Sequence, residues 1–344
     1  MSEFSRTKLP RPSLSGVRTL VVGIEKSGLA SIQLLLRHGA IVRATDLKPL
    51  IELPEAAATL DRLDVPFIQQ THAPAPSPQP QAPAFENCDL IVISPGVPAD
   101  LAALNAARAR GVRVIGEVEL AAPSLLGRTI GITGSNGKTT TTALVGHILH
   151  ESGIAAQVGG NIGTPVAAMV ETSRPDRWNV LELSSFQLET IDQFHADIAV
   201  ALNVTQNHLD RHHTFANYAA AKGRLFETQR PGAFAILNAD DPTCVGYAAL
   251  TPASPLWFSS TRAVTPGLWL ADGKIWFDGD LLMDAREIPI RGRHNIEDTM
   301  AAAAARRCPS GRRAARIHRR RRTHLQSGRA PPRVCAQSRW RRLL

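Results

Sequence analysis

The first 125 residues alternate short apolar runs with glycine turns and segments of helical periodicity. Residues 17–46 read as a buried strand, a glycine turn, an amphipathic helix and a second strand that ends at Asp46. Further strands are predicted at 88–98 and 112–120, with an alanine-rich helix at 101–111 between them. Because strands that alternate with helices build a parallel sheet, we expect a Rossmann-like α/β domain over residues 1–125.

The same pattern restarts near residues 122–127, where we place a domain boundary. Residues 127–153 predict a strand, a glycine loop and a long helix. Further strands are predicted at 178–185, 196–204 and 232–241. We therefore expect a second, central α/β domain of the P-loop ATPase type over residues 126–305.

The positive charge of the chain is concentrated at its end. The net charge is +9, but residues 306–344 hold fourteen arginines and no Asp, Glu or Lys, and without them it is −5. A mildly acidic body argues against a nucleic-acid-binding face on the fold. The arginine run at 319–322 keeps RNA binding as an alternative, which salt-sensitive binding that survives deletion of the tail would support.

The segment 306–344 also lacks the apolar periodicity that could build a core. We expect an aberrant, disordered tail. Arginine-rich, proline-spotted sequence is typical of a GC-rich gene read out of frame, so we interpret the tail as a frameshift product. A genuine basic extension is the alternative.

Cysteine usage and hydropathy indicate the compartment. The four cysteines, at positions 88, 244, 308 and 335, show neither zinc spacing nor a dense disulfide framework. The apolar runs are too short for a membrane span, and the N-terminus lacks the apolar stretch of a signal peptide. We expect a cytoplasmic protein that does not insert into a membrane.

The strongest local signal is GITGSNGKTT at residues 131–140, which follows a predicted strand and opens a predicted helix. Glycines let backbone N–H groups face phosphate oxygens at the helix N-terminus, Lys138 supplies a positive charge, and Thr139 offers a hydroxyl to Mg²⁺. Ile132 stands where the Walker pattern has its first glycine, and a simple strand-to-helix turn is the alternative. The predicted ATP-binding residues here are Gly134, Ser135, Asn136, Gly137, Lys138, Thr139 and Thr140.

Several further motifs resemble, in the same order, the signatures of the Mur ligase family. They are GNIGTP at 160–165, LELSSFQLE at 181–189, NVTQNHLDRH at 203–212, YAAAKGRLF at 218–226, NADDP at 238–242 and GRHN at 292–295. The resemblance covers about residues 17–305, and the ELSSFQLE form is similar to that of the members that add D-glutamate. Another amino-acid ligase of the family remains an alternative.

The resemblance implies a catalytic set of Lys138, Glu182, His208 and Lys222 and two Mg²⁺ sites. Thr139 and Glu182 would hold one ion, and His208 and Lys222 the second. Because an ammonium cannot ligate a metal, Lys222 would be carbamylated, which gives it carboxylate oxygens. From composition alone, a solvated lysine on the 218–226 helix would be favoured, and a lone His or Glu is more often structural.

The resemblance also implies ligand contacts outside the loop. His294 and Asn295 would contact the adenine, although they could simply form a turn before the following helix. The first glycine turn has Glu25 in place of the middle glycine of a dinucleotide fingerprint, which argues against NAD and leaves a UDP site. The predicted residues for UDP-N-acetylmuramoyl-L-alanine are Gly23, Ser27, Gly28, Asp46, Ser94, Gly96, Asn161, Ser184 and Gln187.

The implied reaction forms an acyl phosphate from ATP, which the amine of D-glutamate then attacks. Family members carry a third, C-terminal domain, and nothing after residue 305 resembles it. We therefore expect this chain to lack ligase activity. We also expect it to be a monomer. The rival class is an ATP-binding switch protein, which would need neither Glu182, His208 and Lys222 nor a UDP-binding domain.

Overall fold

The computed structural model describes residues 13–70, 83–290 and 292–308. The predicted tail from 309 onward and most of the proline-rich segment therefore lie outside the described residues. The first domain contains β1 (Arg18–Val22), α1 (Lys26–Arg37), β2 (Ile41–Asp46), α2 (Pro54–Arg62), β3 (Phe67–Gln69), β4 (Leu90–Ile93), α3 (Ala102–Ala109), β5 (Arg113–Gly116) and α4 (Glu117–Ala121).

The first domain is built on a five-stranded sheet in the order β3-β2-β1-β4-β5. Every pairing is parallel, with Leu20 of β1 aligned to Arg43 of β2 and to Ile91 of β4. On α1, buried Gly28, Ile32 and Leu35 recur at helical spacing and place one face against the core. The predicted Rossmann-like parallel sheet is confirmed.

One predicted strand, 112–120, is wrong in its second half. Strand β5 stops at Gly116, and residues 117–121 form the helix α4. The alternation of Val and Glu imitates the period of a strand, but both glutamates are buried and accept hydrogen bonds from backbone N–H groups of the second domain. Their polarity therefore marks contacts between domains and not a solvent face.

The second domain begins at β6 and ends in a long alanine-rich helix. Its elements are β6 (Thr129–Thr133), α5 (Lys138–Glu151), β7 (Ala156–Gly160), α6 (Val166–Met169), β8 (Trp178–Glu182), α7 (Ser185–Leu188), β9 (Ile198–Ala201), α8 (Leu209–His212), α9 (Phe215–Glu227), β10 (Phe234–Asn238), α10 (Pro242–Gly246), β11 (Ser254–Ser259), β12 (Gly267–Ala271), β13 (Lys274–Phe277), β14 (Asp280–Asp284) and α11 (Arg293–Arg307).

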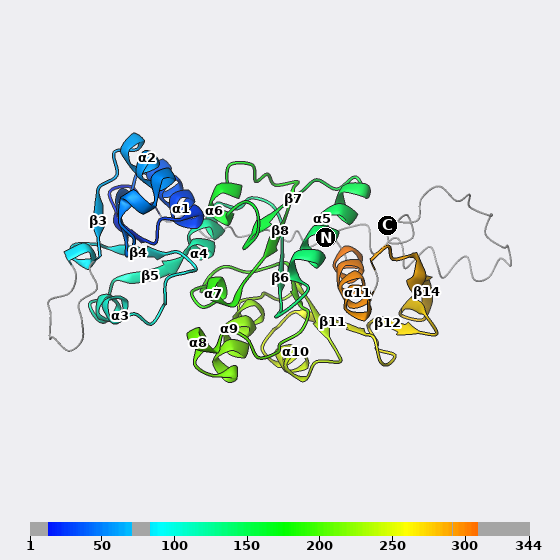
Figure 1. Cartoon of the computed structure of the whole chain (residues 1–344). Helices are drawn as coiled ribbons and strands as arrows, with labels where there is room; N and C mark the ends of the chain where they lie inside the picture. The colour runs from blue at the N-terminus through cyan, green and yellow to red at the C-terminus, as the bar shows by residue number, and fades with distance from the viewer. Residues whose placement is uncertain (1–12, 71–82, 291, 309–344) are drawn as a thin grey trace.

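These strands form one nine-stranded sheet in the order β14-β13-β12-β11-β10-β9-β6-β8-β7. The pairings from β7 to β12 are parallel, whereas β13 and β14 add an antiparallel edge that the sequence patterns did not predict. Helices α5 and α11 lie side by side on one face (Figure 1). Residues 301–305 of α11 are all alanine and nearly all inaccessible, because small side chains allow close packing there.

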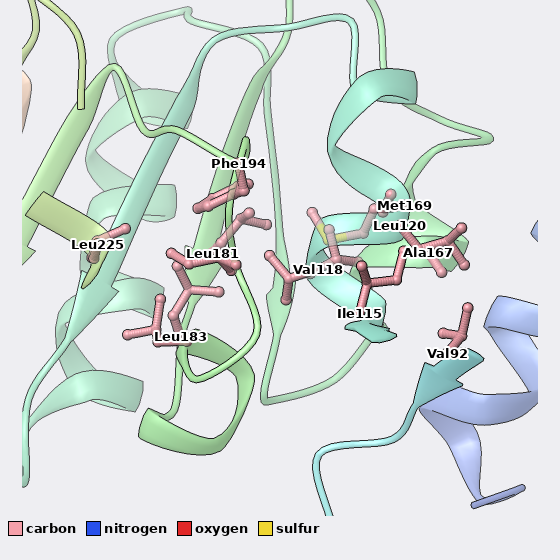
Figure 2. Close-up of a cluster of buried hydrophobic side chains, with 14 of the residues drawn as sticks. Val92, Ile115, Val118, Leu120, Ala167, Met169, Leu181, Leu183, Phe194 and Leu225 are labelled. Carbon is pink, nitrogen blue, oxygen red and sulfur yellow. The ribbon is translucent and has the colours of Figure 1, made fainter. Parts of the chain in front are cut away.

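The opposite face of the second sheet joins the two domains. Helix α6 packs against α1 and α4 of the first domain. Figure 2 shows Val118 and Leu120 of α4 beside Ala167 and Met169 of α6, within one buried apolar cluster that extends into both domains. Among the described residues, no helix is long and apolar enough to cross a membrane.

Candidate active site

The phosphate loop connects β6 to α5, as the sequence predicted. Gly137 has a φ of +82°, and a Cβ atom at this position would lie 2.3 Å from Oδ1 of Asp298. Both the left-handed conformation and the lack of space therefore require glycine. The first N–H groups of α5 have no carbonyl partners within the helix, so they can donate to phosphate oxygens.

Asn203, just beyond β9, holds the loop in shape. Its carbonyl accepts a hydrogen bond from the N–H of Ser135 at 2.9 Å, and its Oδ1 accepts one from the N–H of Asn136 at 2.9 Å. The Asn203 amide nitrogen donates to the carbonyl of Asn136 at 3.2 Å. The loop is thus preorganised by an element distant in sequence.

Lys138 folds back over this loop. Its Nζ donates to the carbonyl of Ser135 at 3.0 Å. Burial lowers the pKa of Lys138, and the carboxylate of Glu182 opposes that shift. Its ammonium group therefore adds a positive charge to the phosphate loop.

Glu182 ends β8, which is the neighbour of β6 in the sheet, and this adjacency brings the carboxylate to the loop. The side chain is 2% exposed. Its Oε2 accepts a hydrogen bond from the Thr139 hydroxyl at 2.8 Å, and its Oε1 accepts one from the Asn161 amide at 3.0 Å. A hydroxyl in the first turn of α5 and a carboxylate at the end of β8 fit the oxygen preference of Mg²⁺.

Lys222 approaches the loop from α9. It is 1% exposed, so the alternative of a solvated lysine is wrong. Its Nζ donates to the carbonyl of Gly134 at 2.9 Å and lies 4.6 Å from the centre of the Tyr218 ring. Burial, and secondarily the charge of Lys138, lower the pKa of Lys222 to about 7. A neutral amine is therefore available near neutral pH.

His208 lies at the edge of this group. The residue is exposed and has a φ of +52° at the start of α8. Its ring centre lies 5.0 Å from that of Phe186 and 6.3 Å from that of Tyr218. Tyr218 is therefore a neighbour of both His208 and Lys222. Among the described residues, no group of three or more His, Cys, Asp or Glu side chains could hold a metal.

The predicted adenine contacts open α11. His294 is exposed, and its Nε2 lies 3.1 Å from the amide nitrogen of Asn295. One turn later, Asp298 lies against Gly137, so the start of α11 adjoins the phosphate loop. Burial raises the pKa of Asp298 to about 6.

The predicted substrate residues of the first domain lie at the carboxyl edge of its sheet, whereas Asn161, Ser184 and Gln187 belong to the second domain. The Ser94 hydroxyl donates to the carbonyl of Gly23 at 2.6 Å, and Asp46 Oδ2 accepts from the N–H of Ile24 at 2.9 Å. Gly28 packs against the same Gly23 carbonyl. Ser27 lies in the first turn of α1 and Gly96 is exposed in the turn after β4. This is the edge at which parallel α/β sheets bind ligands.

Ser184 and Gln187 form the N-terminal cap of α7, the short helix that follows Glu182. The Ser184 hydroxyl accepts from the N–H of Gln187, and Gln187 Oε1 accepts from the N–H of Ser184 at 3.1 Å. This capping box satisfies Gln187 Oε1 and leaves its amide hydrogens for other acceptors.

Three residues that the structure places at the loop have no role predicted from the sequence. These are Asn203, Tyr218 and Asp298. The Tyr218 hydroxyl lies 3.0 Å from the Ser135 hydroxyl. Asn203 and Tyr218 begin motifs that carried the resemblance, and Asp298 follows the GRHN motif by three residues. Their motif positions were a usable signal, but their contacts depend on the tertiary fold.

Comparison with known proteins identifies the family of the chain. The profile of the Mur ligase middle domain matches residues 132–306, and that of the Mur ligase MurD-like N-terminal domain matches residues 17–116. The UDP-N-acetylmuramoylalanine–D-glutamate ligase of Solibacter usitatus is 65% identical over 292 residues, which cover 85% of this chain and 63% of that protein. The ligase of the same name from Koribacter versatilis is 46% identical over 291 residues, which cover 83% and 62%.

The chain thus spans 62 to 63% of the length of these curated relatives. Among solved structures, the UDP-N-acetylmuramate:L-alanyl-gamma-D-glutamyl-meso-diaminopimelate ligase from Neisseria meningitides matches with a TM-score of 0.54 and 18% identity, covering 86% of this chain and 94% of that one. At that identity the likeness concerns the fold alone. Because the middle-domain profile spans more than half of the 344 residues, the chain belongs to the Mur ligase family.

Proposed function

We propose that this chain carries the ATP site and the sugar-nucleotide site of a ligase that adds D-glutamate to UDP-N-acetylmuramoyl-L-alanine. The main observation behind the proposal is that the phosphate loop, a carboxylate and a lysine lie in contact at one edge of the second sheet. The phosphate loop, the buried Glu182 and the buried Lys222 are joined by hydrogen bonds of 2.8 and 2.9 Å. The names of the relatives from Solibacter usitatus and Koribacter versatilis support the choice of substrates.

In this proposal, ATP binds with its phosphates on the first turn of α5 and its adenine near His294 and Asn295. Lys138 leaves the Ser135 carbonyl and places its charge on the terminal phosphates. Thr139 and Glu182 hold one Mg²⁺, which neutralises phosphate charge. Asn161, already bonded to Glu182, fixes the orientation of that carboxylate.

A second Mg²⁺ would be held by His208 and a carbamylated Lys222. The neutral amine of Lys222 attacks CO₂ and loses one proton, which gives a carbamate whose single negative charge is shared by two oxygens. The lowered pKa of about 7 supports this step, because only the neutral amine is nucleophilic. Burial beside the Tyr218 ring would shield the carbamate from water.

The UDP moiety would bind at the edge formed by Gly23, Ser27, Asp46 and Ser94, with the muramoyl-alanine part directed toward Ser184, Gln187 and Asn161. The carboxylate of the alanine then accepts the γ-phosphate of ATP, and the amine of D-glutamate displaces phosphate from the acyl phosphate. We expect a cytoplasmic monomer that binds neither nucleic acid nor membrane.

Titration calorimetry on the 344-residue chain tests the proposal. We expect separate saturable binding of Mg-ATP and of UDP-N-acetylmuramoyl-L-alanine, with UDP-N-acetylglucosamine binding at least about tenfold more weakly because it lacks the lactoyl-alanine group. An ATP-binding switch protein would bind the nucleotide and neither UDP-sugar. That result would contradict the proposal.

A further inference from the structure

Two buried glutamates extend from α4, at the junction of the domains. Glu119 is 4% exposed, and its carboxylate accepts hydrogen bonds from the N–H groups of Asp192, Gln193 and Phe194 and from Arg113. Its burial is therefore fully compensated. Glu119 thus anchors α4 to the second domain.

Glu117 differs from Glu119 in one respect. It is 1% exposed, and its Oε1 accepts a hydrogen bond from the N–H of Ala167 at 2.8 Å. Its Oε2 is fully buried without a hydrogen-bond partner. An unsatisfied buried carboxylate oxygen is costly, so its retention in this position needs an explanation.

Two donors from different domains lie beside Glu117. Burial raises its pKa to about 7, while the neighbouring Ala167 N–H and the side chains of Ser27 and Gln187 lower it. Ser27 belongs to the first turn of α1, and Gln187 belongs to α7, which follows Glu182 by a few residues. The carboxylate is thus a common neighbour of two of the predicted substrate contacts.

Gln187 is well suited to act as a relay. Its Oε1 is already used by the backbone N–H and hydroxyl of Ser184. The amide orientation is fixed by that cap, and both Nε2 hydrogens remain available. One hydrogen can then be donated to Glu117, and the other is left for a ligand.

We propose that Glu117 is a positioning residue for the UDP-linked substrate. Its Oε2 accepts hydrogen bonds from the Ser27 hydroxyl and the Gln187 amide when the anionic substrate binds between the two domains. The bond to Ser27 aligns the backbone N–H groups at the start of α1 with the diphosphate. The bond to Gln187 directs the second amide hydrogen toward the sugar. This inference rests on the proposed function and adds a residue that does not touch the substrate.

Calorimetry with UDP-N-acetylmuramoyl-L-alanine and, separately, with Mg-ADP tests the role of Glu117. We expect E117Q to bind the UDP-sugar at least about tenfold more weakly. The Ala167 N–H takes the carbonyl oxygen of the new side chain, and the NH2 group in the place of Oε2 cannot accept a hydrogen bond from Gln187. Its affinity for Mg-ADP stays within about twofold of wild type. The matched control E119Q, on the same helix, should lower the thermal midpoint while its UDP-sugar affinity stays within about threefold.

A double-mutant cycle separates positioning from folding. If Glu117 acts through Gln187, the loss of UDP-sugar affinity in E117Q/Q187A is smaller than the sum of the two single losses. Wild-type affinity in E117Q, additive losses, or a parallel fall in Mg-ADP affinity would each overturn the inference while leaving the proposed function intact. Absence of UDP-sugar binding in the wild-type chain would overturn both.

Discussion

The sharpest structural test of the phosphate loop is a single methyl group added at Gly137. The residue has a φ of +82°, and a Cβ there would lie 2.3 Å from Asp298 Oδ1. Asp298 is 4% exposed on α11, so its carboxylate has little free space to move into. The substitution G137A therefore combines backbone strain with a collision inside the packed α5–α11 layer.

A second glycine separates these two contributions. Gly153 has a φ of +70°, but a Cβ at that position meets nothing within 4 Å. The left-handed conformation alone should cost G153A about 1–2 kcal/mol of the free energy of unfolding. G137A should lose a further 1–3 kcal/mol or so from overpacking, and the second substitution in G137A/D298A should restore part of that.

Urea unfolding and Mg-ADP calorimetry on G137A, G153A and G137A/D298A measure both effects. We expect G137A to lower nucleotide affinity at least about tenfold, because the loop must move to accommodate the methyl group. G153A should bind Mg-ADP as wild type does. Equal stability and equal nucleotide affinity of G137A and G153A would refute the assigned role of the loop.

Three further predictions follow from the same geometry. K138A should lower Mg-ATP affinity by about 100-fold, since it removes a charge-assisted contact to the phosphates. The control K274A, at an exposed lysine, should leave the affinity unchanged. Equal affinities of the two variants in calorimetry would count against the site. Carbon NMR in ¹³C-bicarbonate should show a carbamate signal that grows as pH rises through about 7 and is absent from K222A, and a signal that persists in K222A would assign it elsewhere. Because the pKa of Glu117 is raised to about 7 in the folded chain, protonation of Glu117 favours the folded state. This contribution to the free energy of unfolding is fully present below the ordinary pKa near 4.5 and is lost as pH rises through 7. E117Q cannot lose a proton in this range, so the difference between its thermal midpoint and that of wild type should rise by about 3 °C from pH 5 to pH 8. A difference that does not change with pH would contradict the raised pKa of Glu117.

The strand–loop–helix units were predictable because their signals are local. Apolar runs, glycine turns and helical spacing placed β1, α1, β6 and α5, and the loop sequence itself indicated phosphate binding. The pairing of Thr139 with Glu182 also followed in outline, since ligand groups gather where parallel strands end. The loop and the strand end could therefore be assigned from the sequence.

Other features depend on the tertiary fold and have no local signal. Helix α4 was mistaken for a strand because Glu117 and Glu119 are buried against distant backbone N–H groups. The antiparallel edge formed by β13 and β14 follows from pairing rather than from periodicity. The burial of Lys222 depends on the approach of α9 to the loop, which composition could not reveal.

The most direct test of the central claim is a crystal structure of the chain with UDP-N-acetylmuramoyl-L-alanine, a non-hydrolysable ATP analogue and Mn²⁺ in place of Mg²⁺. We expect an anomalous manganese peak between Thr139 and Glu182, the nucleotide phosphates on the first turn of α5, and the uridine diphosphate at the edge that holds Gly23 and Asp46. The alanine carboxylate should face the terminal phosphate. Nucleotide bound away from the 134–140 loop, or a UDP-sugar bound away from the first sheet, would contradict the account.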